Sequence, residues 1–242
     1  MKQMLAAFVD LIFPPRCVSC DQPLSGRPDR YFCAACRDRI GFVRSPICLK
    51  CGMPFKSADL NDHLCGDCLT SDTGFSIARC LGRYEETLLD CIHKFKYNEH
   101  LGVGRMLGRM MAVYDYPAFN VSDYTLLMPV PLHPKRLRQR GFNQALILAR
   151  IIAKQHRRPV DFMTLKRQIY TEPQVNLGRN EREANIKGAF KIADEGKITG
   201  EKILLVDDVY TTGSTVKECA KVLMKAGAEE VGVLTVARAV QE

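Results

Sequence analysis

The stretch ILLVDDVYTTGST, residues 203–215, decides which fold this chain can adopt. Its four leading apolar residues are typical of a strand that is buried on both faces of a sheet. They run directly into Asp207 and Asp208, and a short segment of hydroxyls with one glycine follows. In open α/β sheets, ligands bind beyond the carboxyl ends of the strands. We therefore expect both carboxylates to project into a binding site.

The segment after the two acids has the composition of a phosphate-binding loop. Its backbone N–H groups and hydroxyls can surround a dianion, and Gly213 lets the backbone approach closely. The helix expected from about Thr215 adds the positive end of its dipole. Two carboxylates would repel a phosphate that they touched, so we expect them a few ångströms away, accepting hydrogen bonds from neutral hydroxyls. A 5-phosphorylated ribose has that layout.

The rest of the chain after residue 74 alternates between strand and helix patterns. We expect a short strand and a helix within residues 80–97, a helix through 106–111, a buried strand at 125–131, a basic loop, and a helix at about 144–154. A helix at 215–226, closed by Gly227, and a final strand at 231–237 follow. This order predicts an α/β fold with a Rossmann-like, mostly parallel sheet and helices on both faces.

Two other classes of protein also have acidic residues at the end of a strand, but this sequence fits them less well. A nucleotide-hydrolase acidic motif would need a G-x-x-x-x-G-K-[ST] loop, which the chain lacks. A receiver-type acidic pocket would leave the TTGST segment without a role.

Eight of the eleven cysteines lie within residues 17–68 and form four C-x2-C pairs. Two such pairs can place four thiolates tetrahedrally around one Zn²⁺. A segment of about 60 residues with few large apolar side chains lacks a core of its own, so the metal would supply folding energy. The predicted ligands of two structural zinc sites are Cys17, Cys20, Cys33, Cys36, Cys48, Cys51, Cys65 and Cys68.

The pairing of these ligands is open from the sequence. Sequential use of neighbouring pairs gives two zinc ribbons in tandem, whereas a cross-braced arrangement joins the first pair to the third. Disulfides or redox C-x-x-C sites are further alternatives. Because the composition changes near Gly74, we expect two domains. Residues 1–74 would hold an N-terminal helix and the double zinc ribbon, and residues 75–242 the α/β domain.

Basic residues concentrate in one window of a chain whose net charge is +8. Between Tyr124 and Val160 there are eight Lys and Arg residues and no acid. Such a window attracts phosphorylated small molecules, pyrophosphate or nucleic acid, and a solvated basic face is the alternative interpretation.

The sequence also predicts where in the cell the protein is located. No stretch approaches the roughly 18 uninterrupted apolar residues of a membrane span. No small-residue cleavage site follows the first apolar run, so we expect no signal peptide. Because thiols stay reduced in the cytosol, we expect a cytoplasmic protein.

Residues 203–215 resemble the phosphoribosyl-pyrophosphate motif of type I phosphoribosyltransferases. The whole chain resembles the ComF family, in which a Cys-rich zinc module precedes a phosphoribosyltransferase-like domain. Two other family-like segments are MPVPLHPKRLRQRGFNQA, residues 128–145, and TEPQVNLGRNEREANIKGAF, residues 171–190. In the first of these, Met128 replaces the family's valine. The resemblance covers nearly the full length and implies the type I phosphoribosyltransferase fold.

The resemblance also implies roles for particular residues. Asp207 and Asp208 would be the catalytic pair that binds the ribose 2′- and 3′-hydroxyls of phosphoribosyl pyrophosphate. The residues implied to hold the 5-phosphate are Thr211, Thr212, Gly213, Ser214 and Thr215. Those implied to hold pyrophosphate, with which Mg²⁺ would arrive, are Lys135, Arg136 and Arg140. Residues around Arg167 to Arg179 would form a hood, with Gln174, Asn176 and Arg179 as substrate contacts.

Two functions remain open. In the first, a nucleophile displaces pyrophosphate from the ribose of phosphoribosyl pyrophosphate or a related sugar phosphate. ComF-like proteins are associated with natural competence, so the second is a non-catalytic protein that binds single-stranded DNA, or other DNA-uptake proteins, on this scaffold. Lys94 and Lys96 fit a site contact and a solvated helix face equally well. His133 fits a turn better than a general base.

Overall fold

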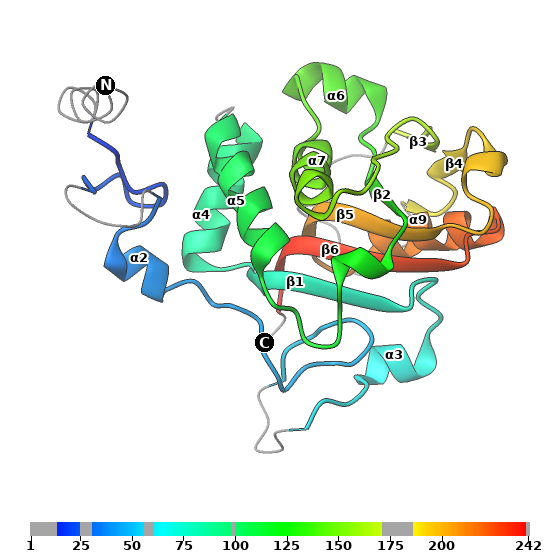
Figure 1. Cartoon of the computed structure of the whole chain (residues 1–242), viewed down its shortest axis with the longest axis horizontal. Coiled ribbons are helices and arrows are strands. Elements are labelled where there is room, and N and C mark those ends of the chain that lie inside the picture. The colour runs from blue at the N-terminus through cyan, green and yellow to red at the C-terminus, as the bar shows by residue number, and fades with distance from the viewer. Residues whose placement is uncertain (1–13, 25–30, 56–60, 98–99, 171–185, 241–242) are drawn as a thin grey trace.

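The computed structural model describes residues 14–24, 31–55, 61–97, 100–170 and 186–240. At its centre lies a four-stranded parallel sheet in the order β1-β6-β5-β2. These strands are β1 (Ile77–Arg83), β6 (Glu230–Arg238), β5 (Lys202–Tyr210) and β2 (Leu126–Pro129). A separate antiparallel pair joins β3 (Leu165–Arg167) to β4 (Phe190–Ile192). The predicted mostly parallel sheet is therefore confirmed (Figure 1).

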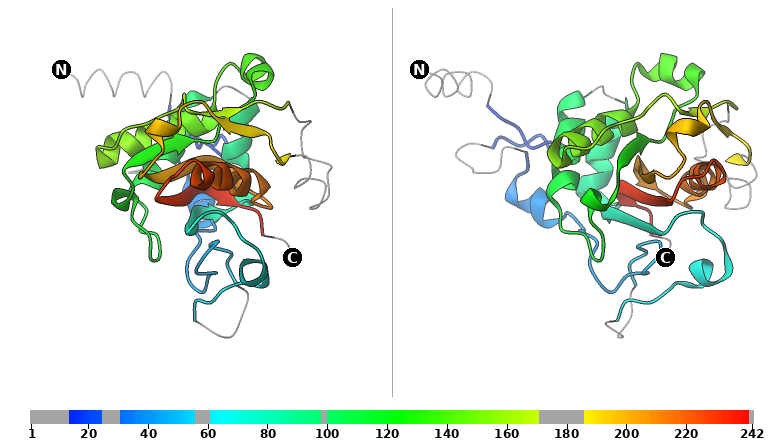
Figure 2. Two further views of the ribbon diagram at one scale, coloured as in Figure 1. Left: turned by 90° about the vertical axis from the view of Figure 1, so that its right-hand side faces the viewer. Right: turned by 45° about the vertical axis from the view of Figure 1, so that its right-hand side comes forward.

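Helices cover both faces of the parallel sheet (Figures 1 and 2). One face carries α4 (Glu86–Tyr97), α5 (Leu101–Val113) and α7 (Gln144–His156), and the other carries α9 (Ser214–Lys225). In β5, Leu204 and Val206 pack toward the first group, whereas Ile203 and Leu205 pack toward α9. Each fully buried side chain of this size contributes about 1.5–3 kcal/mol relative to exposure. Strand β5 is buried on both faces, as its apolar run predicts.

The basic segment after β2 is a helix, so the expectation of a loop there was wrong. Helix α6 spans Pro134–Arg140. His133 caps its start, because its Nδ1 accepts a hydrogen bond from the Lys135 N–H at 3.2 Å. Gly141, at φ +77°, closes its end. Proline in the first turn and glycine just past the end are helix signals, and they outweigh the high polarity of the segment.

The two Cys-rich units lie in different places (Figure 1). The first, with α2 (Ala34–Asp38), lies beside α4, and the second, with α3 (Gly66–Thr70), lies along β1. Backbone hydrogen bonds from the Ala78 N–H to the Lys50 oxygen, 2.7 Å, and from the Val43 N–H to the Leu81 oxygen, 3.1 Å, cover the outer edge of β1. An edge strand that is covered in this way cannot pair with another chain.

Two short 3-10 turns, η1 (Val121–Asp123) and η3 (Glu195–Lys197), complete the described elements. The expected N-terminal helix lies outside the described residues. Within the described ranges, no helix combines the length and the apolar character needed to cross a membrane.

Candidate functional site

The two acids at the end of β5 lie on different sides of the strand. Asp208 is buried and faces α4, where its carboxylate pairs with the Lys96 ammonium at 3.0 Å. Asp207 is half-buried and lies within electrostatic reach of Cys219 on α9 and of Arg167 at the end of β3. Successive side chains of a strand point to opposite faces, which explains the division. Both acids stand at the carboxyl edge of the sheet.

Lys96 contacts the acidic pair at the end of β5, whereas Lys94 contacts the first Cys-rich unit. The Lys96 side chain is only 18% exposed. Burial lowers its pKa, but the carboxylates of Asp208 and Asp207 outweigh burial and raise it. Lys94, on the same helix, donates instead to the Ser19 carbonyl oxygen at 3.0 Å and pairs with exposed Asp21 at 2.8 Å. From the sequence, the two lysines were equal candidates for a contact with the site. In the folded protein they have different partners.

Asp207 has an unusual acidity. Burial and the neighbouring Asp208 carboxylate raise its pKa to about 7, although the Asp208 N–H donates to its Oδ1 at 2.8 Å. A carboxyl of this kind exchanges its proton near neutral pH, so it can either donate to or accept from a hydroxyl.

The loop after β5 is a tight turn that leads into α9. Gly213 has φ +78° and occupies the position before the helix, which begins at Ser214. The hydroxyls of Thr212 and Ser214 lie 2.6 Å apart, while Thr211 is exposed and Thr215 is half-buried in the first turn of α9. Unsatisfied N–H groups and the helix dipole make such a start attractive to an anion.

The Lys and Arg side chains of α6 lie near this edge, where they contact aromatic and polar residues. The Lys135 ammonium lies 4.4 Å from the centre of the Tyr170 ring, and Arg140 donates to Gln144 Oε1 at 2.9 Å. Burial and then the charge of Arg136 lower the pKa of Arg167, so these two guanidinium groups are near neighbours. Arg167, expected at the start of a hood, is the last residue of β3.

An aromatic group beside the acidic pair was missed from the sequence. Tyr84 follows β1 directly, and its hydroxyl lies 3.0 Å from His93 Nε2. The His93 ring meets Tyr97 edge to face at 5.9 Å, and the Arg140 guanidinium lies 5.7 Å from the centre of the Tyr97 ring. His93, Lys96 and Tyr97 are three and four residues apart on α4, so they share one helix face. This spacing is the sequence signal from which the group could have been predicted.

The cysteines form two groups, each with its ligand atoms within 4.8 Å of one another: Cys17, Cys20, Cys33 and Cys36, and Cys48, Cys51, Cys65 and Cys68. The sulfurs of Cys51 and Cys65 are 3.7 Å apart. This matches the edge of about 3.8 Å that four Zn–S bonds of about 2.3 Å require in a tetrahedron. The residues therefore fit Zn²⁺, and the pairing is sequential.

Backbone donors stabilise the thiolate form of Cys48. Cys48 Sγ accepts from the N–H groups of Cys51, at 3.4 Å, and Cys65, at 3.3 Å. Burial raises the pKa of Cys48, but these bonds and the neighbouring thiol lower it to about 7. The thiolate, which is the form that binds zinc, is favoured.

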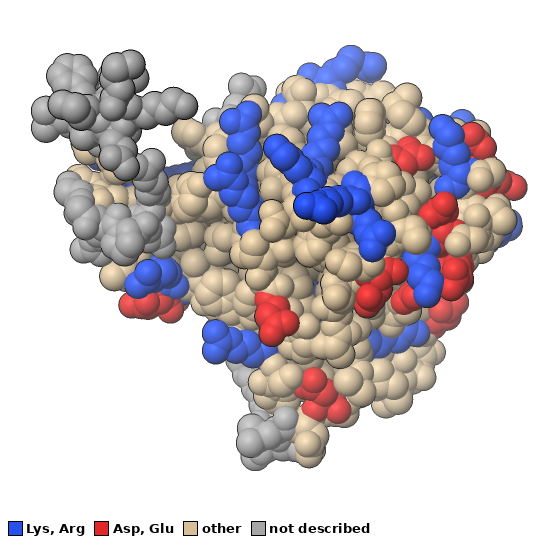
Figure 3. All heavy atoms as spheres, in the orientation of Figure 1, with Lys and Arg blue, Asp and Glu red and all other residues tan. Residues whose placement is uncertain are grey.

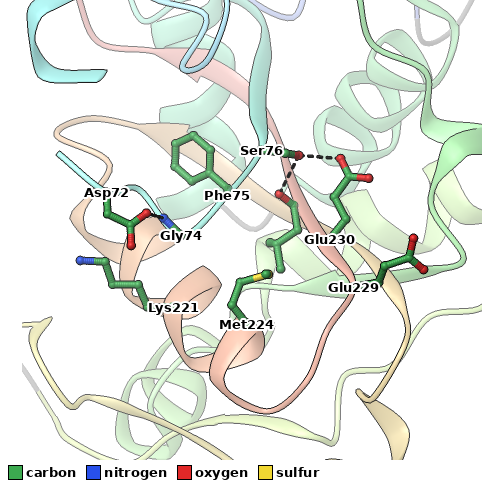
Figure 4. A pocket seen from close by; sticks show the side chains of 9 residues that line it. Asp72, Gly74, Phe75, Ser76, Lys221, Met224, Glu229 and Glu230 are labelled. Carbon is green, nitrogen blue, oxygen red and sulfur yellow. Dashed lines mark hydrogen bonds between the residues drawn. The ribbon is translucent and has the colours of Figure 1, made fainter. Parts of the chain in front are cut away.

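A cavity of about 530 Å³ lies elsewhere, between the end of the second Cys-rich unit and α9 (Figure 4). Ser76 donates to Glu230 there at 2.6 Å, and both residues lie at the amino end of the sheet. This is the opposite edge from Asp207 and Asp208. Its acids, Asp72, Glu229 and Glu230, make it a poor site for phosphate.

Comparison with known proteins identifies the family. The family model of a double zinc ribbon domain matches residues 8–69, and that of a phosphoribosyl transferase domain matches residues 143–242. The chain is 31% identical to Competence protein F of Haemophilus influenzae, over 86% of this chain and 96% of that protein. The chain belongs to the ComF family.

Other relatives of this ComF-family chain carry related names. DNA utilization protein YhgH of Escherichia coli K12 is 29% identical, over 94% of this chain and 99% of that protein. Competence protein ComFC of Bacillus subtilis is 24% identical, over 87% of this chain and 89% of that protein. The resemblance noted from the motifs is confirmed: a double zinc ribbon precedes a phosphoribosyltransferase-type domain.

The remaining ComF-like residues expected at the site, Gln174, Asn176 and Arg179, lie outside the described residues. His133 caps a helix, and its ring meets Tyr170 edge to face at 5.3 Å.

Proposed function

We propose that this ComF-family protein binds phosphoribosyl pyrophosphate, with Mg²⁺, at the carboxyl edge of its parallel sheet. The observation that carries the proposal is the succession at the end of β5, where two carboxylates lead into a glycine turn and the start of α9. Asp207 and Asp208 accept hydrogen bonds from the ribose 2′- and 3′-hydroxyls. The turn formed by residues 211–215 holds the 5-phosphate.

The cations of α6 hold the other end of the ligand. Lys135, Arg136 and Arg140 stand after β2, the neighbour of β5 in the sheet, and bind the pyrophosphate. Mg²⁺ prefers phosphate oxygens and keeps several waters, so it would be held mainly by the pyrophosphate and by water. When bound, this ion neutralises charge on the leaving pyrophosphate.

The reaction that fits this arrangement is transfer of the phosphoribosyl group. A nucleophile displaces pyrophosphate from ribose C1, and positive charge develops on the ribose ring. The carboxylates of the acidic pair stabilise that charge, while the α6 cations stabilise the leaving group. Removing one such electrostatic contact costs on the order of 10²–10³ in rate.

Binding is tested by calorimetric titration of phosphoribosyl pyrophosphate with Mg²⁺. Wild type is compared with a variant that carries Asp207→Asn and Asp208→Asn. The matched control carries Glu229→Gln and Glu230→Gln, which neutralise two adjacent acids at the amino end of β6. We expect binding by wild type and by the control, and none by the aspartate variant at unchanged zinc content. Retained affinity in the aspartate variant rules out this site.

Single-stranded DNA binding is a second candidate, favoured by the aromatic group on α4. Tyr97 is 66% exposed beside a cationic guanidinium. Bases stack on such rings, and basic side chains hold the backbone. Lys and Arg side chains also gather over α5 and α7 in Figure 3, and the relatives are named for competence and DNA utilization.

A Tyr97→Leu variant tests the DNA candidate. Phe162→Leu is the comparison variant, because Phe162 is also exposed and has the Arg150 guanidinium 5.2 Å from its ring centre. Affinity for a single-stranded oligonucleotide should fall roughly tenfold in Tyr97→Leu, the loss expected for one stacked base. An affinity of Tyr97→Leu equal to that of wild type excludes stacking on Tyr97.

A further inference from the structure

A buried arginine joins the second Cys-rich unit to the end of the sheet. Arg238, the last residue of β6, is 4% exposed. Its Nη1 donates to the Cys51 carbonyl oxygen at 2.7 Å, and its Nη2 lies 3.5 Å from the Cys51 sulfur. One side chain therefore touches both the backbone and the ligand atom of a zinc-binding residue.

The other side of the same guanidinium rests on Tyr210. Its central carbon lies 4.1 Å from the centre of the Tyr210 ring, and the two residues are partners in the β5–β6 pairing. Tyr210 is itself 4% exposed, and Phe75 meets its ring edge to face at 6.4 Å. The ring is fixed between the arginine and its apolar neighbours.

Tyr210 in turn supports the turn that leads into α9. A Cβ atom placed on Gly213 would lie 2.3 Å from the Tyr210 hydroxyl, so the ring lies directly against the glycine backbone. An unbroken series of contacts thus runs from Cys51 through Arg238 and Tyr210 to Gly213. Each member is buried, and packed interiors transmit displacement because they contain few voids.

Charge explains why an arginine holds this place. A buried guanidinium is costly unless it is paired. Four thiolates around one Zn²⁺ carry two net negative charges, which complement Arg238 at this position. The planar guanidinium also stacks on a ring while donating at its edge, which lysine cannot do.

The first Cys-rich unit makes different contacts. In the part of the chain that the structure describes, its Cys36 carbonyl accepts from Thr87 Oγ1 at 2.8 Å, and Ser19 donates to Asp90 at 2.7 Å. Both partners belong to α4. The two units are therefore not equivalent with respect to the turn.

We propose that the second zinc ribbon braces the phosphate-binding turn, with Arg238 as the positioning residue. Formation of its zinc site holds Cys51, Cys51 holds Arg238, and Arg238 holds Tyr210 against Gly213. This inference rests on the proposed binding of a sugar phosphate by residues 211–215. It gives a ligand-binding domain of this kind a reason to carry a zinc ribbon.

The first experiment compares Arg238→Lys with Arg79→Lys. Arg79 is the matched control, because it is 3% exposed and donates to the Leu49 carbonyl of the same ribbon at 3.2 Å from the neighbouring strand β1. Amide hydrogen exchange of residues 211–217 is measured on the unliganded full chain. We expect at least tenfold faster exchange there in Arg238→Lys and no change in Arg79→Lys. Equal exchange in both variants overturns the brace.

The second experiment removes one zinc ligand from each ribbon. Cys65→Ser affects the second ribbon and Cys20→Ser the first, and each should lower the zinc content from two ions to one. Only Cys65→Ser should weaken binding of phosphoribosyl pyrophosphate with Mg²⁺, by roughly tenfold. Equal weakening in both variants contradicts the brace. If wild type binds no phosphoribosyl pyrophosphate, the proposed function fails, and hydrogen exchange still decides the brace.

Discussion

Gly213 is the residue on which the turn after β5 depends. Its φ of +78° lies in the left-handed region, and an added Cβ would meet the Tyr210 hydroxyl at 2.3 Å. We predict that Gly213→Ala lowers the free energy of unfolding by about 1–3 kcal/mol, because the backbone must hold a strained conformation or displace the ring. Urea unfolding measures this loss, and calorimetry should show that phosphoribosyl pyrophosphate no longer binds.

A second glycine provides the control for that experiment. Gly102 lies in α5 with open space around its added Cβ and no positive φ. Gly102→Ala should stabilise the helix by roughly 0.5–1 kcal/mol. If the two alanine variants unfold at the same urea concentration, the steric argument for Gly213 is wrong.

The acidity of Asp207 makes stability depend on pH. Its folded pKa is about 7, whereas an unfolded aspartate titrates near 3.9. Between these values the folded state binds more protons, so this carboxyl makes stability fall as pH rises toward 7. We predict that Asp207→Asn, relative to wild type, gains about 2 kcal/mol between pH 5.5 and pH 8. Urea unfolding with saturating zinc measures the difference, and a constant difference refutes the assigned pKa.

At the scale of the helix, α4 carries two lysines that are two residues apart and do different things. Lys96→Met leaves the buried Asp208 carboxylate without its ammonium partner, so we predict a loss of about 3 kcal/mol in the free energy of unfolding. Lys94→Met removes a pair with Asp21, whose side chain is 69% exposed, and should cost less than about 1 kcal/mol. Thermal or urea unfolding of both variants makes the comparison. The reverse order would show that Asp208 is not held by Lys96.

Helix and strand periodicity predicted most elements of the α/β region. The apolar run at 203–206 predicted β5, and Gly227, at φ +91°, ends α9 as expected. Helix α6 was missed because its exposed residues show no apolar periodicity, and only its two ends carry helix signals. The placement of Lys96 could not be predicted, since it depends on how α4 packs on β5.

At the scale of the whole molecule, the two groups of four cysteines lie in units that have little core of their own, so we expect bound zinc to stabilise them. We predict two zinc ions per chain. We expect a strong chelator to remove both and unfold the ribbons while the parallel sheet persists, because Leu204, Leu205 and Leu234 are buried by helices rather than by metal. Metal analysis gives the stoichiometry, and far-ultraviolet circular dichroism follows the sheet. Loss of all secondary structure with the metal would show that the chain folds as one unit.

The sequence by itself determined the zinc ligands, the parallel α/β fold, the family and the order of chemical groups at the end of β5. These follow from local spacing, since C-x2-C pairs, buried runs and turn residues act over a few neighbours. The domain boundary at residue 74 and the roles of Asp207 and Asp208, both inferred from the sequence, remain predictions.

Only the tertiary structure decided which distant groups meet. It placed Lys96 against Asp208, separated the two acids onto different sides of β5, and joined Cys51 to Tyr210 through Arg238. These contacts join residues far apart in sequence, and they form only when packing of the sheet, the helices and the second ribbon buries their charges together. The periodicity of the sequence cannot predict these contacts, because each contact depends on how distant segments pack in three dimensions.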